Sequence, residues 1–180
     1  MYEACSSGTY YNLAMLKSLL IGAMLVFGQE PQPSPTGVIA GSVTIPMDRQ
    51  LSQPLQVVLL SPQYAALWDS DVQKRLDTYW ERYKPAFIQN KEFFIEISRR
   101  AQIEALDYVI MRMRRDQPGT ISEYVQQAGV EGKFEFKSIP FGEYKILAVG
   151  KVQNLDLIWQ ESVDVRNPIP QFLELKKAIP

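Results

Sequence analysis

The chain has 180 residues, of which 46% are hydrophobic and 22% charged, and its formal net charge is −1. These fractions are typical of about one folded globular domain, and the near-neutral charge argues against a global attraction to nucleic acid or acidic lipid. The sequence has no histidine and a single cysteine, Cys5. This composition excludes histidine-based catalytic triads, histidine-ligated metals and c-type haem attachment.

A short apolar run at 18–28 follows the cation Lys17. It is too short to cross a bilayer, which takes about 20 apolar residues, and it has the length of the apolar region of a signal peptide. We therefore predict a signal peptide at 1–28, for which Met15 is a better start than Met1. The protein is then secreted or periplasmic, with no integral membrane span after cleavage. An N-terminal anchor that is not cleaved is the alternative.

The stretch 29–36 is polar, carries three prolines and is typical of a linker. Two β-branched runs, at 37–45 and 55–60, predict the first two strands. At Ser61 the hydrophobic period changes to that of a helix, with this serine as a candidate N-cap and Pro62 in the first helical position.

Two long helices are predicted next. The first has an apolar stripe about 100° wide, formed by Trp68, Val72, Leu76, Tyr79, Tyr83 and Phe87. Pro85 is expected to kink or break this helix. The second runs from about Lys91 to Arg115 and is apolar around most of its circumference, so we expect apolar neighbours on more than one side. Residues 120–123 resemble a capping box and predict a short third helix that Gly129 closes.

From Val130 the period returns to two residues. The strands that this period predicts span 133–137, 144–149, 157–165 and 172–175, with a turn at 139–142. The alternation places four apolar side chains on one face of a hairpin: Phe134, Phe136, Tyr144 and Ile146. Such a face needs a second sheet to cover it.

Two motifs in these strands resemble those of carboxypeptidase regulatory-like domains. Residues 132–148 (GKFEFKSIPFGEYKILA) contain a glycine, Phe-x-Phe, Pro-x-Gly and a tyrosine in the order of that group. Residues 37–43 resemble its opening strand, Gly-x-Ile-x-Gly-x-Val, and residues 56–60 its second strand. The resemblance implies a mainly β fold with an α insert. It would be an antiparallel, seven-strand, prealbumin-like (transthyretin-like) β-sandwich at 37–180, with a helical hairpin inserted between the second and third strands at 62–128.

The chain departs from this group in its long insert, since the corresponding loop is usually short. One relative forms an isopeptide bond with a lysine of the first strand, and residues 37–45 contain no lysine. Another relative is a hydrolase that relies on histidines, which this chain lacks. The resemblance therefore implies a non-catalytic module of exported, cell-envelope proteins, and we expect no catalytic residue, metal site or cofactor.

Two groups of residues are candidates for contact with a ligand or partner. Trp80 and Tyr83 belong, with Trp68 and Tyr79, to a candidate aromatic platform for a sugar, although the stripe on which most of them lie favours core packing. Trp80, at the edge of the stripe, is the best candidate for exposure. Arg112, Arg114 and Arg115 cluster at the end of the second helix, where they either compensate the helix dipole or bind an acidic partner. The insert between positions 69 and 124 has equal numbers of acidic and basic residues, which weakens the second reading.

The paired carboxylates of Asp69 and Asp71 near the start of the first helix favour a structural role, because no loop with the ligand spacing of a cation site follows. We predict that the insert either mediates a protein–protein interaction or has a structural role. The partner would be an unknown envelope or extracellular protein, or a second copy of the chain. Nucleic acid is not an expected partner. The alternatives are a carbohydrate or small-ligand binding module and an uncharacterised hydrolase with an unusual carboxylate or Ser/Lys mechanism.

Overall fold

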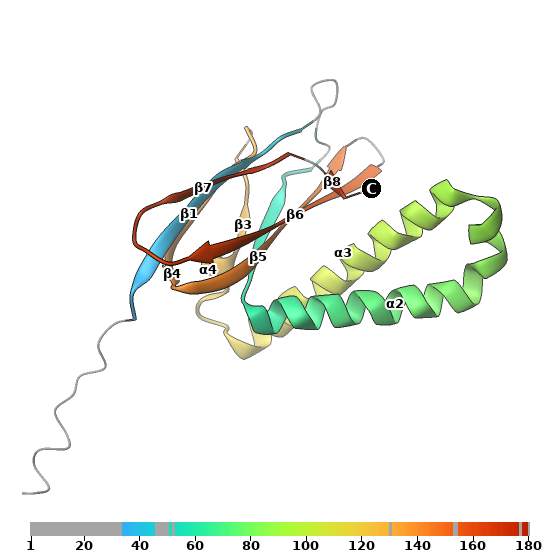
Figure 1. Ribbon diagram of the computed structural model, residues 1–180, viewed down its shortest axis with the longest axis horizontal. Helices are drawn as coiled ribbons and strands as arrows, with labels where there is room; N and C mark the ends of the chain where they lie inside the picture. The colour runs from blue at the N-terminus through green and yellow to red at the C-terminus, as the bar shows by residue number, and fades with distance from the viewer. Residues whose placement is uncertain are drawn as a thin grey trace, which may run out of the picture. The chain divides into compact units, whose positions relative to one another are not determined.

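The computed structural model describes residues 34–45, 51, 53–129, 131–152, 155–176 and 178–179. The predicted signal peptide at 1–28 and most of the predicted linker at 29–36 lie outside the described residues. Two β-sheets and a long helical hairpin form the described part of the chain (Figure 1). None of the described helices combines the length and the apolarity that crossing a bilayer requires.

The two sheets together hold eight strands. The three-stranded sheet has the order β4 (Lys133–Pro140), β1 (Thr36–Val43) and β7 (Gln171–Leu175). The five-stranded sheet has the order β3 (Val125–Gln127), β2 (Gln56–Leu60), β5 (Gly142–Val152), β6 (Leu155–Val165) and β8 (Ala178–Ile179). All six strands expected from the sequence are present, and the two additional strands are the short β3 and β8. The described residues thus form one strand more than the seven that the resemblance implies, counting the two-residue β8.

The expectation of a purely antiparallel sandwich is also wrong, because β1 and β7 run parallel, with Ile39 opposite Gln171 and Val43 opposite Leu175. After β6 the chain leaves the five-stranded sheet, crosses at 166–170 and enters the other sheet alongside β1. A tight turn cannot join parallel neighbours, and here all the elements from β2 to β6 lie between β1 and β7 in the chain. Hydrophobic alternation within a strand carries no information on the direction of its neighbour.

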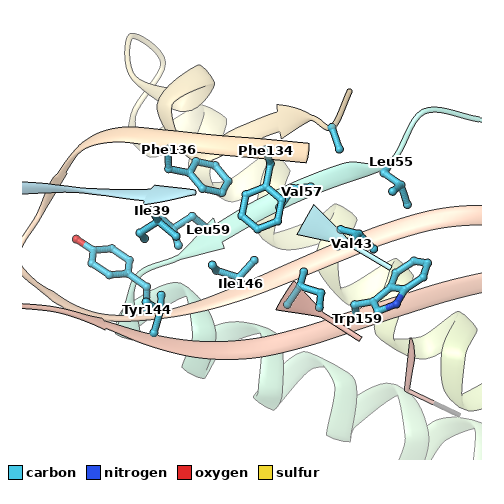
Figure 2. Packing of buried hydrophobic residues seen from close by; sticks show 14 of the residues in the cluster. Ile39, Val43, Leu55, Val57, Leu59, Phe134, Phe136, Tyr144, Ile146 and Trp159 are labelled. Atoms are coloured by element: carbon cyan, nitrogen blue, oxygen red, sulfur yellow. The ribbon is translucent and has the colours of Figure 1, made fainter. Parts of the chain in front are cut away.

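The core between the sheets is apolar and closely packed (Figure 2). It contains the four side chains that the alternation placed on one face, Phe134, Phe136, Tyr144 and Ile146, and this prediction is confirmed. Trp159 also lies in this core and is 1% exposed. The hydroxyl of Tyr144 donates to the carbonyl oxygen of Pro140 at 2.9 Å and so closes the turn between β4 and β5.

Two glycines of the strand motifs have steric roles. A Cβ atom on Gly41 would lie 2.6 Å from the carbonyl oxygen of Leu173 in β7 and 2.5 Å from the ring of Phe134 in β4. Gly132 has a φ of 72°, which L-residues rarely adopt, and a Cβ there would lie 2.6 Å from the carbonyl oxygen of Val43. Both glycines therefore allow β1 to approach its neighbours.

The five-stranded sheet is covered on both faces. Its inner face contributes Val57, Leu59 and Ile146 to the core between the sheets. Its outer face contributes Val58, Leu60, Leu147 and Ile158 to a second core. This explains why residues 57–60 form a continuous apolar run in which every side chain is 0% exposed.

The helical hairpin that covers the outer face consists of α2 (Pro62–Gln89) and α3 (Lys91–Asp116). Residues of α2 and α3 next to the sandwich complete the second core, among them Trp68, Leu106 and Val109. The predicted helices and their position after the second strand are thus confirmed. Since α3 packs against both α2 and the sheet, its apolar residues extend beyond one stripe.

Pro85 lies inside α2 and does not break it. The last turns of the helix curve toward α3 instead (Figure 1). The aromatic side chains on either side of the proline explain this continuity. Tyr83 and Phe87 each contact Phe93 of α3, with ring centroids 5.8 Å and 5.5 Å apart, so packing offsets the hydrogen bond that the proline removes.

The predicted third helix is only one turn long, α4 (Ile121–Tyr124). Thr120 makes no side-chain capping hydrogen bond, so the predicted capping box is wrong. The chain does not continue as a helix to Gly129, because β3 pairs with β2, with Val125 opposite Val58. A three-residue strand is too short to show a period in the sequence.

Candidate functional site

The end of the hairpin farthest from the sandwich is a tight connection of two helices through one residue, Asn90. Its backbone N–H donates to the carbonyl oxygen of Ala86 at 2.9 Å and so ends α2. Its side-chain oxygen accepts from the backbone N–H groups of Glu92 at 3.0 Å and Phe93 at 3.2 Å and so caps α3. This connection places the last turns of α2 directly against the first turns of α3.

Aromatic side chains from both helices meet at this connection. We call the group formed by Trp80, Tyr83, Phe87, Ile88, Phe93 and Phe94 the tip. Phe87 is its centre, with ring centroids 5.8 Å from Trp80, 6.1 Å from Tyr83, 5.5 Å from Phe93 and 5.2 Å from Phe94. Contacts of this kind between aromatic rings are each worth about 0.5–1.5 kcal/mol beyond their buried area.

The rim of the tip is exposed. Phe87 is 5% exposed, whereas Trp80 and Phe94 are each 40% exposed and Ile88 is 71% exposed. Neither of the two cores formed by described residues includes a tip residue. The tip is therefore an apolar cluster that the described chain covers on one side only.

The predicted contact residues separate into two groups in the structure. Trp80 is exposed, as expected, and Tyr83 is half-buried beside it. The three arginines lie at the other end of α3, which rises about 1.5 Å per residue, so Arg112 lies about 27 Å along the helix from Phe94. The two groups therefore do not form one site.

The arginine group is partly neutralised by Asp116. The Nε atom of Arg112 lies 2.9 Å from one carboxylate oxygen of Asp116, and that of Arg115 lies 3.7 Å from the other. Arg114 is exposed. The geometry favours the reading in which these cations compensate the end of the helix over the reading as a free basic patch.

A polar network holds the middle of the hairpin together. The carboxylate of Glu104 on α3 accepts from Tyr79 at 2.7 Å, from Arg75 at 2.9 Å and from Arg100 at 2.8 Å. Burial alone raises the pKa of Glu104, but the hydrogen bonds from Arg100 and Tyr79 outweigh it, and the pKa is lowered. The hydrogen bond between Tyr79 and Glu104 raises the pKa of Tyr79, and burial, the second cause, raises it further. Two of the three donors lie on α2, so the network links the two helices.

The carboxylates considered for chemistry take part in ion pairs. Asp69 accepts from Lys145 of β5 at 2.8 Å, and the Lys145 ammonium also lies 4.9 Å from the centroid of the Trp68 ring. Asp71 pairs with Arg75 at 2.6 Å. Among the described residues there is no group of three or more histidine, cysteine, aspartate or glutamate side chains placed to hold a metal ion.

Two of the hollows among the described residues lie between the hairpin and the five-stranded sheet, and the larger of them reaches the first turns of α3 beside the tip. One, of about 400 Å³, lies between the first turn of α2 and strands β5 and β6 and includes Pro62, Tyr144 and Val163. The other, of about 720 Å³, lies between α3 and the start of β6 and includes Arg99 and Asp156. The Nε atom of Arg99 is buried without a hydrogen-bond partner among the described residues.

No family model matches the chain, and no curated protein matches it. Among solved structures, it is distantly similar to the Pseudomonas aeruginosa protein PA1324, a proposed carbohydrate-binding protein. The identity is 17% and the TM-score 0.36, over 81% of this chain and 91% of the other. It is also distantly similar to the pilus backbone protein RrgB of Streptococcus pneumoniae, with 12% identity and a TM-score of 0.30, over 79% of this chain and 41% of the other.

Sequence reasoning did not identify two of the most exposed tip residues, Ile88 and Phe94. A signal for Phe94 was available, because adjacent residues on a helix point about 100° apart, so Phe93 and Phe94 cannot both lie at the centre of the face toward α2. The same signal was available for Ile88, because it follows Phe87 of the predicted stripe and so points about 100° away from it.

Proposed function

We propose that this chain is an exported, non-catalytic β-sandwich module of the cell envelope that binds another protein through the tip of its helical hairpin. The observation that carries the proposal is the exposed apolar rim, in which Trp80, Ile88 and Phe94 are 40%, 71% and 40% exposed. Aromatic side chains are enriched at the centres of protein interfaces, where a partner excludes water from them. Exposed apolar clusters on soluble proteins commonly mark such interfaces.

The shape of the tip favours a protein partner over a sugar. Small-ligand sites are concave, and the exposed rim residues Trp80, Ile88 and Phe94 line neither of the two hollows described above. Trp80 is stacked on Phe87 at an interplanar angle of 30°, with Phe94 edge-on at 87°, so part of its ring surface is already used. A projecting cluster of this kind fits a groove on a partner better than it encloses a small ligand.

The proposed family and the absence of catalysis have separate support. The motif glycines Gly41 and Gly132 stand where a Cβ atom would collide with neighbouring backbone, which fits a carboxypeptidase regulatory-like, prealbumin-like module. Asp69 pairs with Lys145 of β5 and Asp71 with Arg75 of α2, which supports a structural role for both carboxylates.

Site-specific photocrosslinking in the producing cell tests the proposal. A photoreactive phenylalanine analogue replaces Ile88 at the tip or, as the matched control, Phe172 of β7, which is 81% exposed on the sandwich. We expect a discrete protein adduct from position 88 that is absent from position 172. The same adducts at both positions, or no adduct at position 88, would contradict the proposal.

The carbohydrate alternative makes a different prediction about Trp80. If the tip were a sugar platform, a panel of soluble glycans would change the tryptophan fluorescence in a saturable way, and Trp80→Ala would abolish that change. We expect no saturable change with the unaltered protein. A saturable change that Trp80→Ala removes would replace the protein-binding proposal with the carbohydrate one.

A further inference from the structure

The larger hollow beside the hairpin is lined by charges of both signs. One face of α3 contributes Glu92, Glu96 and Arg99, and the start of β6 contributes Asp156. Among the described residues, the three side chains of α3 form no ion pair, and the nearest cation to Asp156 is Lys151, at 4.0 Å. The hollow therefore combines carboxylates and a guanidinium that are not paired with one another.

The guanidinium of Arg99 lacks an acceptor. Its Nε atom is buried and has no hydrogen-bond partner in the described part of the chain. An arginine side chain carries five N–H donors and no acceptor, and a buried donor without a partner is costly. By contrast, Arg100, the other cation of this hollow, is bound to Glu104 at 2.8 Å. A carboxylate is the acceptor that best matches the fork of a guanidinium.

The smaller hollow differs in this respect. Lys145, which lines it, is paired with Asp69 at 2.8 Å, and Asp164, which also lines it, is paired with Arg166 at 2.6 Å. The chain itself thus compensates the cation of that hollow and one of its acids. The larger hollow is the better candidate for a charged ligand.

The spacing of the unpaired charges sets the length of a matching ligand. Glu92, Glu96 and Arg99 follow one another at intervals of four and three residues, so they share one face of α3. Seven residues of a helix rise about 10 Å, and an extended peptide spans about 3.5 Å per residue, so about three peptide residues match this face. The volume of about 720 Å³ is ordinary for a ligand of this size. Ile95 and Leu155 line the same hollow and offer apolar contacts.

We propose that this hollow binds a short peptide with free termini, of about three residues. The carboxylate of the peptide pairs with Arg99, its ammonium lies between Glu92 and Glu96, and its side chains contact Ile95 and Leu155. A ligand with one charge would leave half of these groups unpaired, so a zwitterion fits better than a simple anion or cation. This inference goes beyond the proposed function and does not depend on it, because the exposed rim of the tip does not line the hollow.

Titration of the ¹⁵N-labelled protein with trialanine, followed by NMR, tests the site. We expect saturable shifts centred on the backbone amides of 92–100 and 155–156. Two capped forms of the same peptide are the matched ligands, since N-acetyl-trialanine lacks the ammonium and trialanine amide lacks the carboxylate. Each should bind about tenfold more weakly or worse, because one part of the site stays unpaired.

Variants of the protein assign each end of the peptide. Arg99→Gln should weaken trialanine by about tenfold or more and should no longer distinguish it from its amide. Glu96→Gln should likewise reduce the preference for trialanine over the N-acetyl form. The matched control is Arg114→Gln, which alters an exposed arginine of the same helix outside the hollow and should leave binding unchanged. Circular dichroism checks that the variants fold.

Three results would overturn the inference. The first is the absence of saturable shifts up to about 10 mM trialanine. The second is an affinity that both Arg99→Gln and Glu96→Gln leave unchanged. The third is a capped peptide that binds as tightly as trialanine, which would make the hollow a site for a simple anion or cation. None of them bears on the proposed function, whose test is the crosslink at position 88.

Discussion

The two halves of the helical hairpin each contain a tryptophan of α2, and the two tryptophans differ in exposure. Near the sandwich, Trp68 of α2 is 4% exposed, and its indole N–H donates to the carbonyl oxygen of Gln102 at 3.0 Å. At the far end of the same helix, Trp80 is 40% exposed and contacts other aromatic rings. Trp68 packs in the core between the hairpin and the five-stranded sheet, whereas the ring contacts of Trp80 among the described residues are with the hairpin itself.

The comparison shows that the hairpin is longer than its core requires. Packing on the sheet uses residues of the near half, such as Tyr64, Leu106 and Met113. The polar network around Glu104 then links the two helices in the middle of the hairpin, where a polar link is less costly than in a dry core because water still reaches it. The far half therefore presents an apolar tip without depending on the sandwich to bury it.

The largest expected effect separates the two tryptophans directly. Trp68→Ala should lower the free energy of unfolding by about 3–5 kcal/mol, because it leaves a cavity in a closed core. Trp80→Ala should cost only about 1 kcal/mol, mainly from lost ring contacts. Urea denaturation of both variants measures the difference, and equal losses would show that the tip belongs to the fold as much as the near half does.

A second change tests the sandwich without touching the hairpin. Gly41→Ala should cost about 1–3 kcal/mol, because the new methyl group meets the carbonyl oxygen of Leu173 and the ring of Phe134. The matched control is Gly119→Ala, since a Cβ there has nothing within 4 Å. Thermal unfolding of both variants should show a lower midpoint for Gly41→Ala alone.

The link between the helices should depend on pH. Because the folded state lowers the pKa of Glu104 from its ordinary value of 4.5, this carboxylate stabilises the protein above pH 4.5, and the stabilisation is lost as the pH falls below it. Glu104→Gln should therefore cost about 1–2 kcal/mol at neutral pH. The cost should shrink in acid, and urea denaturation at pH 7 and near pH 3 measures both values. A cost that is the same at both pH values would show that the charge of Glu104 does not matter.

The smallest effect concerns the contact between α2 and the sheet. Lys145→Ala removes both the ion pair with Asp69 and the cation contact with the Trp68 ring. Since Asp69 is 57% exposed, solvent screens the ion pair, and the total cost should be about 0.5–1 kcal/mol. Lys137→Ala, which removes an exposed pair with Glu135, is the control and should cost less.

Local patterns predicted most of the elements, and long-range packing decided the rest. Alternation at 133–137 and the helical stripe through Trp68 and Phe87 were sufficient to place strands, helices and the core-facing side chains. The parallel pairing of β1 with β7 and the pairing of β3 with β2 were not predictable, because each depends on segments far apart in the sequence.

The candidate site was predictable only in part. The position of Trp80 at the edge of its stripe indicated exposure, and in the structure Trp80 is exposed. The same pattern gave no reason to group Trp80 with Phe94, since the contact between their rings depends on the one-residue connection at Asn90. The arginines at the end of α3 were visible in the sequence, but their shared partner Asp116 decides how much free charge they carry.

The most direct test of the central claim is the stability of Ile88→Asp, measured by urea denaturation at a protein concentration too low for self-association. If the tip is a docking surface, the free energy of unfolding should change by no more than about 0.5 kcal/mol, as for other exposed positions. A loss of about 3 kcal/mol or more, in the range of core substitutions, would contradict the account and make the tip part of the core.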